Sequence, residues 1–174
     1  MVIHFSQHSE PEINFAHGYQ PGEIDLADEM AQAIGNIEIA GAARRSSEIA
    51  RVKGTIHGNF EIACSRCLQP VPFELNASFD VDFVTFENYG SAHEETELNG
   101  ADLSLSVYDG EQIDLDEITR EQILLNLPMQ ELCRKDCAGL CAVCGANKNV
   151  VSCDCEQTDI DPRWNALREL KSET

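Results

Sequence analysis

The chain has 174 residues, with 31 acidic and 12 basic side chains and a formal net charge of −19. That length suits one domain with a small appendage and is too short for two full domains, and the acidic charge argues against a nucleic-acid binder of the usual basic kind. The N-terminus lacks the basic and apolar regions of a signal peptide, and no apolar run approaches a membrane span, so we expect a cytoplasmic protein with no membrane partner.

The first 47 residues carry weak structural signals. Residues 25–31 predict a short helix, because Asp25 can act as its N-cap and further acids follow in the first turn. Residues 41–47, with the sequence GAARRSS, indicate a loop or a connection between strands.

Two long strands are predicted between residues 52 and 83. Apolar residues alternate with polar or small ones, a period that is typical of half-buried strands. The alternating residues are Val52, Ile56, Phe60 and Ile62 in the first strand and Val71, Phe73, Leu75, Ala77, Phe79, Val81 and Phe83 in the second. We expect an antiparallel hairpin with the C-x2-C motif of Cys64 and Cys67 at or near its tip.

The second half of the chain predicts one strand and two helices. An acidic, mobile loop is expected over 87–101, followed by a strand over 103–108 and a hairpin turn at Asp109-Gly110 that leads toward residues 112–113. A helix is predicted over 114–127, with Asp114 as its cap and a proline directly after it. A short terminal helix is predicted to begin at Asp161.

Six of the eight cysteines lie between residues 133 and 155. In a reducing compartment, such cysteines indicate metal ligands rather than disulfides. The segment Cys141-Ala142-Val143-Cys144-Gly145 has the form of a metal-binding knuckle, because its glycine tolerates a positive φ and lets backbone N–H groups point at the sulfurs. Zinc is the expected ion, in a structural rather than a catalytic site, since no histidine lies near the cluster in the sequence.

Six thiols exceed the four ligands of a tetrahedral structural site. The first choice of ligands is Cys141, Cys144, Cys153 and Cys155, and in the alternative Cys137 or Cys133 replaces one of the last two. Cys64 and Cys67 could form half of a second site, join leftover thiols such as Cys133, or act as a redox pair. Redox C-x2-C motifs normally open a helix, so the position between strands favours metal binding or packing.

Three stretches of the sequence together resemble a known family. They are CSRCLQPV at 64–71, IDL at 113–115 with EQILLNLP at 121–128, and the cysteine-rich segment 133–155. In their order and spacing the chain resembles the YceD family, described as large-subunit ribosomal RNA accumulation proteins. The resemblance implies a bacterial or organellar protein that supports synthesis, processing or stability of that RNA, and it supplies no catalytic mechanism.

Three functional hypotheses follow. The first is a non-enzymatic assembly factor that docks a basic ribosomal protein, an RNA-bound partner or a pre-ribosomal particle. The second is direct binding of large-subunit ribosomal RNA through the Cys64–Cys67 tip, helped by Arg66. The third is a thiol oxidoreductase. We expect no enzyme, because the sequence contains no H-E-x-x-H, no G-x-S-x-G and no phosphate-binding glycine loop.

The predicted fold is α+β. We expect an antiparallel, partly barrel-like sheet built around the 48–86 hairpin, with the 114–127 helix packed on it and a C-terminal zinc knuckle. The predicted organisation is a YceD-like domain over 1–130, a cysteine-rich knuckle over 131–157 and a C-terminal helix over 158–174.

Overall fold

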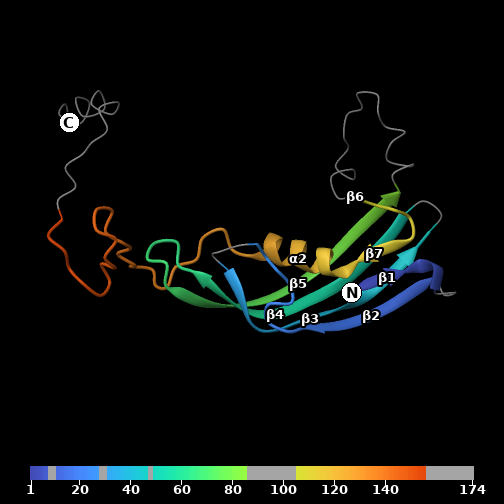
Figure 1. The fold of residues 1–174 in the computed structure, drawn as a ribbon, viewed down its shortest axis with the longest axis horizontal. Helices are drawn as coiled ribbons and strands as arrows, with labels where there is room; N and C mark the ends of the chain where they lie inside the picture. The colour runs from blue at the N-terminus through green and yellow to red at the C-terminus, as the bar shows by residue number, and fades with distance from the viewer. Residues whose placement is uncertain (8–10, 28–30, 47–48, 86–104, 156–174) are drawn as a thin grey trace, which may run out of the picture. The chain divides into compact units, whose positions relative to one another are not determined.

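The computed structural model describes residues 1–7, 11–27, 31–46, 49–85 and 105–155 (Figure 1). The chain divides into two compact units. Unit 1 comprises residues 1–62 and 71–129, and unit 2 comprises residues 63–70 and 130–174. Unit 2 is therefore assembled from two segments that lie far apart in the sequence.

Unit 1 contains a five-stranded sheet in the order β2-β3-β4-β5-β6 (Figure 1). Its strands are β2 (Glu12–Tyr19), β3 (Ala31–Arg45), β4 (Ile49–Ala63), β5 (Pro70–Thr85) and β6 (Leu105–Tyr108). The ion pairs Arg51–Asp82 and Lys53–Asp80 join β4 to β5 with residue numbers that rise along one strand and fall along the other. The predicted antiparallel hairpin is therefore present.

The sheet is open and mixed, so the expectation of an antiparallel, partly barrel-like sheet was wrong. Among the described residues, β2 and β6 are its two edges, and β6 runs parallel to β5. A parallel neighbour needs a connection of roughly a dozen residues or more. The segment 86–104 between β5 and β6 is long enough for such a connection.

The turn at Asp109-Gly110 forms, but it does not make the predicted hairpin. Gly110 has a φ of 87°, and the carboxylate of Asp109 accepts hydrogen bonds from the backbone N–H groups of Glu111 and Gln112. The following strand, β7 (Gln112–Asp114), pairs antiparallel with β1 (Val2–His4) in a separate two-stranded sheet. A single 3-10 turn (Phe5–Gln7) follows β1.

The predicted helix over residues 25–31 was also wrong. Ala27 has a φ of 50°, which lies outside the right-handed helical region, and Ala31 already begins β3. The carboxylate of Asp25 accepts a hydrogen bond from the N–H of Ala27, so it stabilises a local turn instead of a helix. Residues 28–30 lie outside the described residues.

Residues 41–45, predicted as a loop or connection, lie within β3, where Gly41 pairs with Gly54 of β4. A Cβ atom on Gly54 would lie 2.5 Å from the carbonyl oxygen of Ala40 and 2.7 Å from the ring of Phe79. The small residues here allow a close approach of backbone and aromatic ring, and they do not mark a break in the strand.

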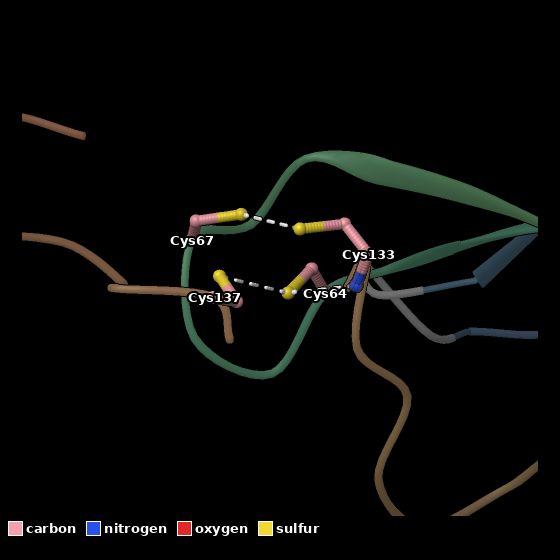
Figure 2. Close-up of side chains that lie close together, drawn as sticks. All are labelled: Cys64, Cys67, Cys133 and Cys137. Atoms are coloured by element: carbon pink, nitrogen blue, oxygen red, sulfur yellow. Dashed lines mark hydrogen bonds between the residues drawn. The ribbon is translucent and has the colours of Figure 1, made fainter. Parts of the chain in front are cut away.

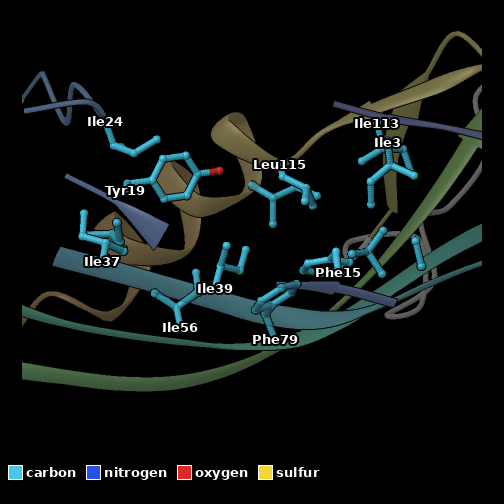
Figure 3. Packing of buried hydrophobic residues seen from close by; sticks show 14 of the residues in the cluster. Ile3, Phe15, Tyr19, Ile24, Ile37, Ile39, Ile56, Phe79, Ile113 and Leu115 are labelled. Carbon is cyan, nitrogen blue, oxygen red and sulfur yellow. The ribbon is translucent and has the colours of Figure 1, made fainter. Parts of the chain in front are cut away.

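The predicted helix is confirmed as α2 (Leu115–Asn126). The carboxylate of its N-cap, Asp114, accepts a hydrogen bond from the N–H of Asp116. The buried side chains of α2 share one core with those of the sheet (Figure 3). This core includes Leu115, Ile118 and Ile123 of the helix and Ile37, Ile39, Val52, Ile56, Phe60, Leu75 and Phe79 of the sheet.

The predicted mobile loop over 87–101 and the predicted terminal helix from Asp161 lie outside the described residues. Among the helices that the structure does describe, none has the length and apolar character needed to cross a membrane.

The close packing at Gly54 leads to a stability prediction. Gly54→Ala should lower the free energy of unfolding by roughly 1–3 kcal/mol, because its methyl group would overlap the Phe79 ring and a backbone carbonyl. Gly18→Ala is the matched control, since that strand glycine has no atom within 4 Å of an added Cβ and should lose little stability. Urea unfolding of both variants measures the difference, and equal loss in both would contradict the packing argument.

Candidate metal centres

All eight cysteines lie in unit 2, where they form two sets of four. Site I consists of Cys64, Cys67, Cys133 and Cys137, and site II consists of Cys141, Cys144, Cys153 and Cys155. Within each set the sulfur atoms lie within 4.8 Å of one another. Each set could therefore hold one metal ion.

The distances between sulfur atoms in site I fit a metal ion with tetrahedral coordination. Cys64 and Cys67 come from the turn between β4 and β5, and their side chains point toward those of Cys133 and Cys137 (Figure 2). The Sγ atoms of Cys64 and Cys137 lie 3.9 Å apart, and those of Cys67 and Cys133 lie 3.6 Å apart. A tetrahedron with metal–sulfur bonds of about 2.3 Å has edges of about 3.8 Å, whereas a disulfide bond measures about 2.05 Å.

A tight backbone turn presents the first two thiols of site I. The N–H of Leu68 donates to the carbonyl oxygen of Cys64, at 2.9 Å, and the N–H of Cys64 donates to the carbonyl oxygen of Gln69, at 2.8 Å. Leu68 has a φ of 60°, in the left-handed region, and its side chain is 55% exposed. An L-residue in this conformation costs roughly 1–2 kcal/mol.

Site II begins with a turn of the same geometry. The N–H of Gly145 donates to the carbonyl oxygen of Cys141, at 2.9 Å, and the N–H of Cys141 donates to the carbonyl oxygen of Ala146, at 2.8 Å. Gly145 has a φ of 71°. The two C-x2-C motifs are thus the same structural knuckle, with glycine in the left-handed position of one and Leu68 in that of the other.

Backbone N–H groups favour the thiolate form of one cysteine in each site. The N–H of Cys133, 3.4 Å from the sulfur of Cys64, is the main cause that lowers the pKa of Cys64 to about 6. In site II the N–H groups of Cys144 and Val143 lower the pKa of Cys141 to about 6. Because metal-bound cysteine is the thiolate, both sites are chemically suited to a thiophilic cation.

One further thiol in each site has a raised pKa. Desolvation of its sulfur among the neighbouring thiols, and then the hydrogen bond with the thiol of Cys67, raises the pKa of Cys133 to about 12. In site II, contact with Cys144 raises the pKa of Cys155 to about 12. Four thiolates repel one another when no cation lies between them, and a bound cation would remove this repulsion.

Arg66 belongs to the scaffold of site I. Its guanidinium donates to the carbonyl oxygen of Cys137, at 2.9 Å, and its own carbonyl oxygen accepts from the N–H of Leu140, at 3.0 Å. Gly139 has a φ of 73°, and a Cβ there would lie 3.1 Å from the carbonyl oxygen of Arg66. The RNA contact proposed for Arg66 stays a prediction.

The structure brings together the first-choice ligand set as site II, and it places both Cys133 and Cys137 beside the upstream pair. Sequence reasoning left this pairing open, because nothing local connects residues 64–67 with residues 133–137. It included Asn149 in the segment that resembles the family but gave it no role at the site; the Nδ2 of Asn149 donates to the sulfur of Cys137 at 3.3 Å. An asparagine near a cysteine cluster carries no signal of its own until the fold is known.

The ligand sets predict metal stoichiometry. The purified chain should bind Co²⁺ at two tetrahedral thiolate sites, and Cys67→Ser and Cys144→Ser should each remove one of the two ions, because each variant leaves one site with three thiolates. Ala142→Ser, a change inside the second knuckle at a position that is not a ligand, is the control. Full cobalt binding by either cysteine variant would contradict the assignment.

The knuckle geometry predicts opposite effects at two positions. Leu68→Gly should strengthen metal binding at site I and Gly145→Ala should weaken it at site II, each by about 1 kcal/mol or roughly fivefold, because only glycine adopts a positive φ without strain. Leu68→Ala separates backbone strain from loss of the side chain and should bring no gain. Competition with a chelator measures the affinities, and equal effects of Leu68→Gly and Leu68→Ala would exclude strain as the cause.

The chain is similar to known proteins over most of its length. The family model described as "Large ribosomal RNA subunit accumulation protein YceD" matches residues 52–171. The chain is 24% identical to the uncharacterized protein YlbN of Bacillus subtilis over 97% of this chain and 94% of that protein. No solved structure matches the chain.

Two further relatives are longer than this chain. A Mycobacterium tuberculosis protein is 34% identical over 71% of this chain and 56% of its own length. The maize protein "Large ribosomal RNA subunit accumulation protein YCED homolog 1, chloroplastic" is 27% identical over 63% of this chain and 45% of its own length. The match thus spans about half the length of these two relatives, whereas the family model covers more than half of this chain. The chain therefore belongs to the YceD family of large ribosomal RNA subunit accumulation proteins.

Proposed function

We propose that this protein is a non-enzymatic factor that supports assembly of the large ribosomal subunit. In this proposal unit 1 docks a basic ribosomal protein or another basic part of a pre-ribosomal particle, and unit 2 is held together by two structural zinc ions. The observation that carries the proposal is the unequal distribution of charge between the two units.

Unit 1 carries 23 of the 31 acidic side chains and 5 of the 12 basic ones, which is −18 of the net charge of −19. Unit 2 carries the remaining 8 acidic and 7 basic side chains. A zinc ion with four thiolates has a formal charge of about −2, so metal binding makes unit 2 more negative as well. Such a field attracts a basic protein surface and repels RNA phosphates.

A groove in unit 1 suits the side chains of a basic partner. It has a volume of about 450 Å³ and lies between β6, β7 and α2. Its acidic lining consists of Asp109, Asp114, Glu117 and Glu121, and none of the described residues that line it is basic. Apolar residues such as Phe83 and Ile118 also line it, so that the stem of a lysine or arginine can pack while its charged end meets a carboxylate.

Two features of this groove favour an extended basic segment. Glu117 and Glu121 lie four residues apart on α2, and partial burial together with the Glu117 carboxylate raises the pKa of Glu121. A cation between the two carboxylates would relieve this repulsion. In addition, β6 is an edge strand among the described residues, and an edge can accept a further strand from a partner.

Structural zinc fits the chemistry of unit 2 better than a catalytic metal ion does. Each site supplies four thiolates and leaves no open coordination position, which is typical of structural zinc. All eight thiols belong to one of these sets, which supports a protein without a catalytic cysteine. Direct RNA binding through Arg66 has less support, because its guanidinium already bonds to the carbonyl of Cys137.

Relatives support the ribosomal setting. Those from maize and Arabidopsis thaliana carry large ribosomal RNA subunit accumulation in their names. Accumulation of an RNA can depend on a protein that never touches it, if that protein delivers or holds an RNA-binding partner. The acidic character of unit 1 favours this indirect role.

The test compares two variants with the same change of charge. The tagged protein should retain basic large-subunit proteins from a ribosomal extract after nuclease treatment, and binding should weaken as salt rises. Glu117→Lys combined with Glu121→Lys should cut binding about tenfold or more, because it places cations in the groove. Glu38→Lys combined with Glu74→Lys, on exposed strand positions of the same unit, is the control.

Equal losses in both double variants would show that only the overall field matters and would contradict the groove. Loss of binding on nuclease treatment, or tight binding of the isolated protein to a large-subunit RNA fragment at physiological salt, would overturn the proposal in favour of direct RNA binding.

A further inference from the structure

The two metal sites are joined by a short segment of backbone. Gly139 and Leu140 lie between Cys137, the last ligand of site I, and Cys141, the first ligand of site II. The carbonyl oxygen of Gly139 accepts from the N–H of Lys148, at 2.9 Å, and Leu140 forms an antiparallel bridge with Asn147. The residues that follow the second knuckle, Asn147 and Lys148, are thus bonded to the short link between the last ligand of site I and the first ligand of site II.

Asn149, in the turn that follows this bridge, reaches site I with its side chain. Its Nδ2 donates to the Sγ of Cys137, at 3.3 Å, and to the Oδ1 of Asn147, at 2.8 Å. Its Oδ1 accepts from the N–H of Ala138, at 2.8 Å, and from the guanidinium of Arg134, at 2.6 Å. One amide therefore bonds a ligand of site I, the backbone beside that ligand, and Asn147, the bridge residue that follows the second knuckle.

We propose that Asn149 couples the two metal sites, so that a metal ion at site II strengthens metal binding at site I. This inference rests on the metal binding of the proposed function and adds a specific role for one residue. The metal at site II holds its knuckle and the following residues 146–149 in place, and these residues position the amide donor on the sulfur of Cys137. By linkage, a metal ion at site I strengthens binding at site II by the same factor.

The burial of Cys137 explains why this one hydrogen bond matters. Its side chain is 2% exposed, so water cannot replace the amide donor if residues 145–149 lose their order. A thiolate that has lost a donor is harder to keep charged in a buried site, and outer hydrogen-bond partners of metal ligands typically contribute about 10–100-fold to affinity.

The test measures the affinity of site I for Co²⁺ in the full chain by competition with a chelator. Cys144→Ser disables site II and should weaken site I about tenfold. Asn149→Asp keeps the acceptor oxygen and the shape of the side chain but replaces the donor to Cys137 with an oxygen. It should weaken site I by a similar factor, and adding Cys144→Ser should then have no further effect.

A spectroscopic signal separates a direct bond to sulfur from a general loss of order. In Asn149→Asp the thiolate-to-cobalt charge-transfer band of site I should move to lower energy, because the sulfur loses a hydrogen-bond donor. Asn126→Asp, the same chemical change in α2, is the control and should alter neither the affinity nor the band. Asn149→Ala provides a second variant if Asn149→Asp fails to fold.

The outcomes distinguish this inference from the proposed function. A wild-type chain that binds fewer than two cobalt ions would refute the metal sites themselves. Two bound ions with a site I affinity that ignores Cys144→Ser would overturn the coupling. Undiminished coupling in Asn149→Asp and Asn149→Ala would show that the Leu140–Asn147 backbone bridge carries it, and would overturn the role of Asn149.

Discussion

The stability of unit 2 depends on how the charge of its clustered thiolates is neutralised. In the part of unit 2 that the structure describes, the only buried side chains are those of Cys64, Cys67, Cys137 and Cys141. The thiols therefore take the place that apolar side chains take in an ordinary core. Four thiolates at close range repel one another, so this core is stable only if protons or a cation neutralise them. A cation would do so with far more directional bonding, and we therefore expect metal binding and folding of unit 2 to be a single event.

Unit 1 is stabilised in a different way. Its sheet and α2 bury one continuous set of apolar side chains, and the stability of such a core does not depend on thiol chemistry. Unit 1 also carries nearly all of the net negative charge, which in the proposed function attracts a basic partner. One unit thus has an acidic surface and an apolar core, and the other has eight thiols in two sets that could each hold a metal ion.

The two knuckles show how far local geometry can be shared between different sequences. Both turns use the same pair of backbone hydrogen bonds, yet one has Gly145 and the other has Leu68 in the left-handed position. The strain at Leu68 must be offset by its surroundings, which include the carbonyl and guanidinium contacts of Arg66 with the segment 137–140. Leu68 is also exposed, so burial of its side chain does not offset the strain.

The sequence alone determined the elements that depend on neighbouring residues. Alternating apolar side chains predicted β4 and β5, and a capping aspartate and a following proline predicted the two ends of α2. The segment from Cys141 to Gly145 predicted a knuckle. Such signals are local, because backbone preference and side-chain period act over a few residues.

Only the tertiary structure decided which distant segments meet. Several contacts join residues that are not near one another in the sequence. They are the parallel pairing of β6 with β5, the separate β1–β7 sheet, the grouping of Cys64 and Cys67 with Cys133 and Cys137, and the hydrogen bond from Asn149 to a buried sulfur. Small residues at Gly41 suggested a loop for the same reason, since the neighbouring strand that requires them lies elsewhere in the chain. Pairing over long separations is governed by burial and by the satisfaction of polar groups across the whole fold, and no local pattern encodes it.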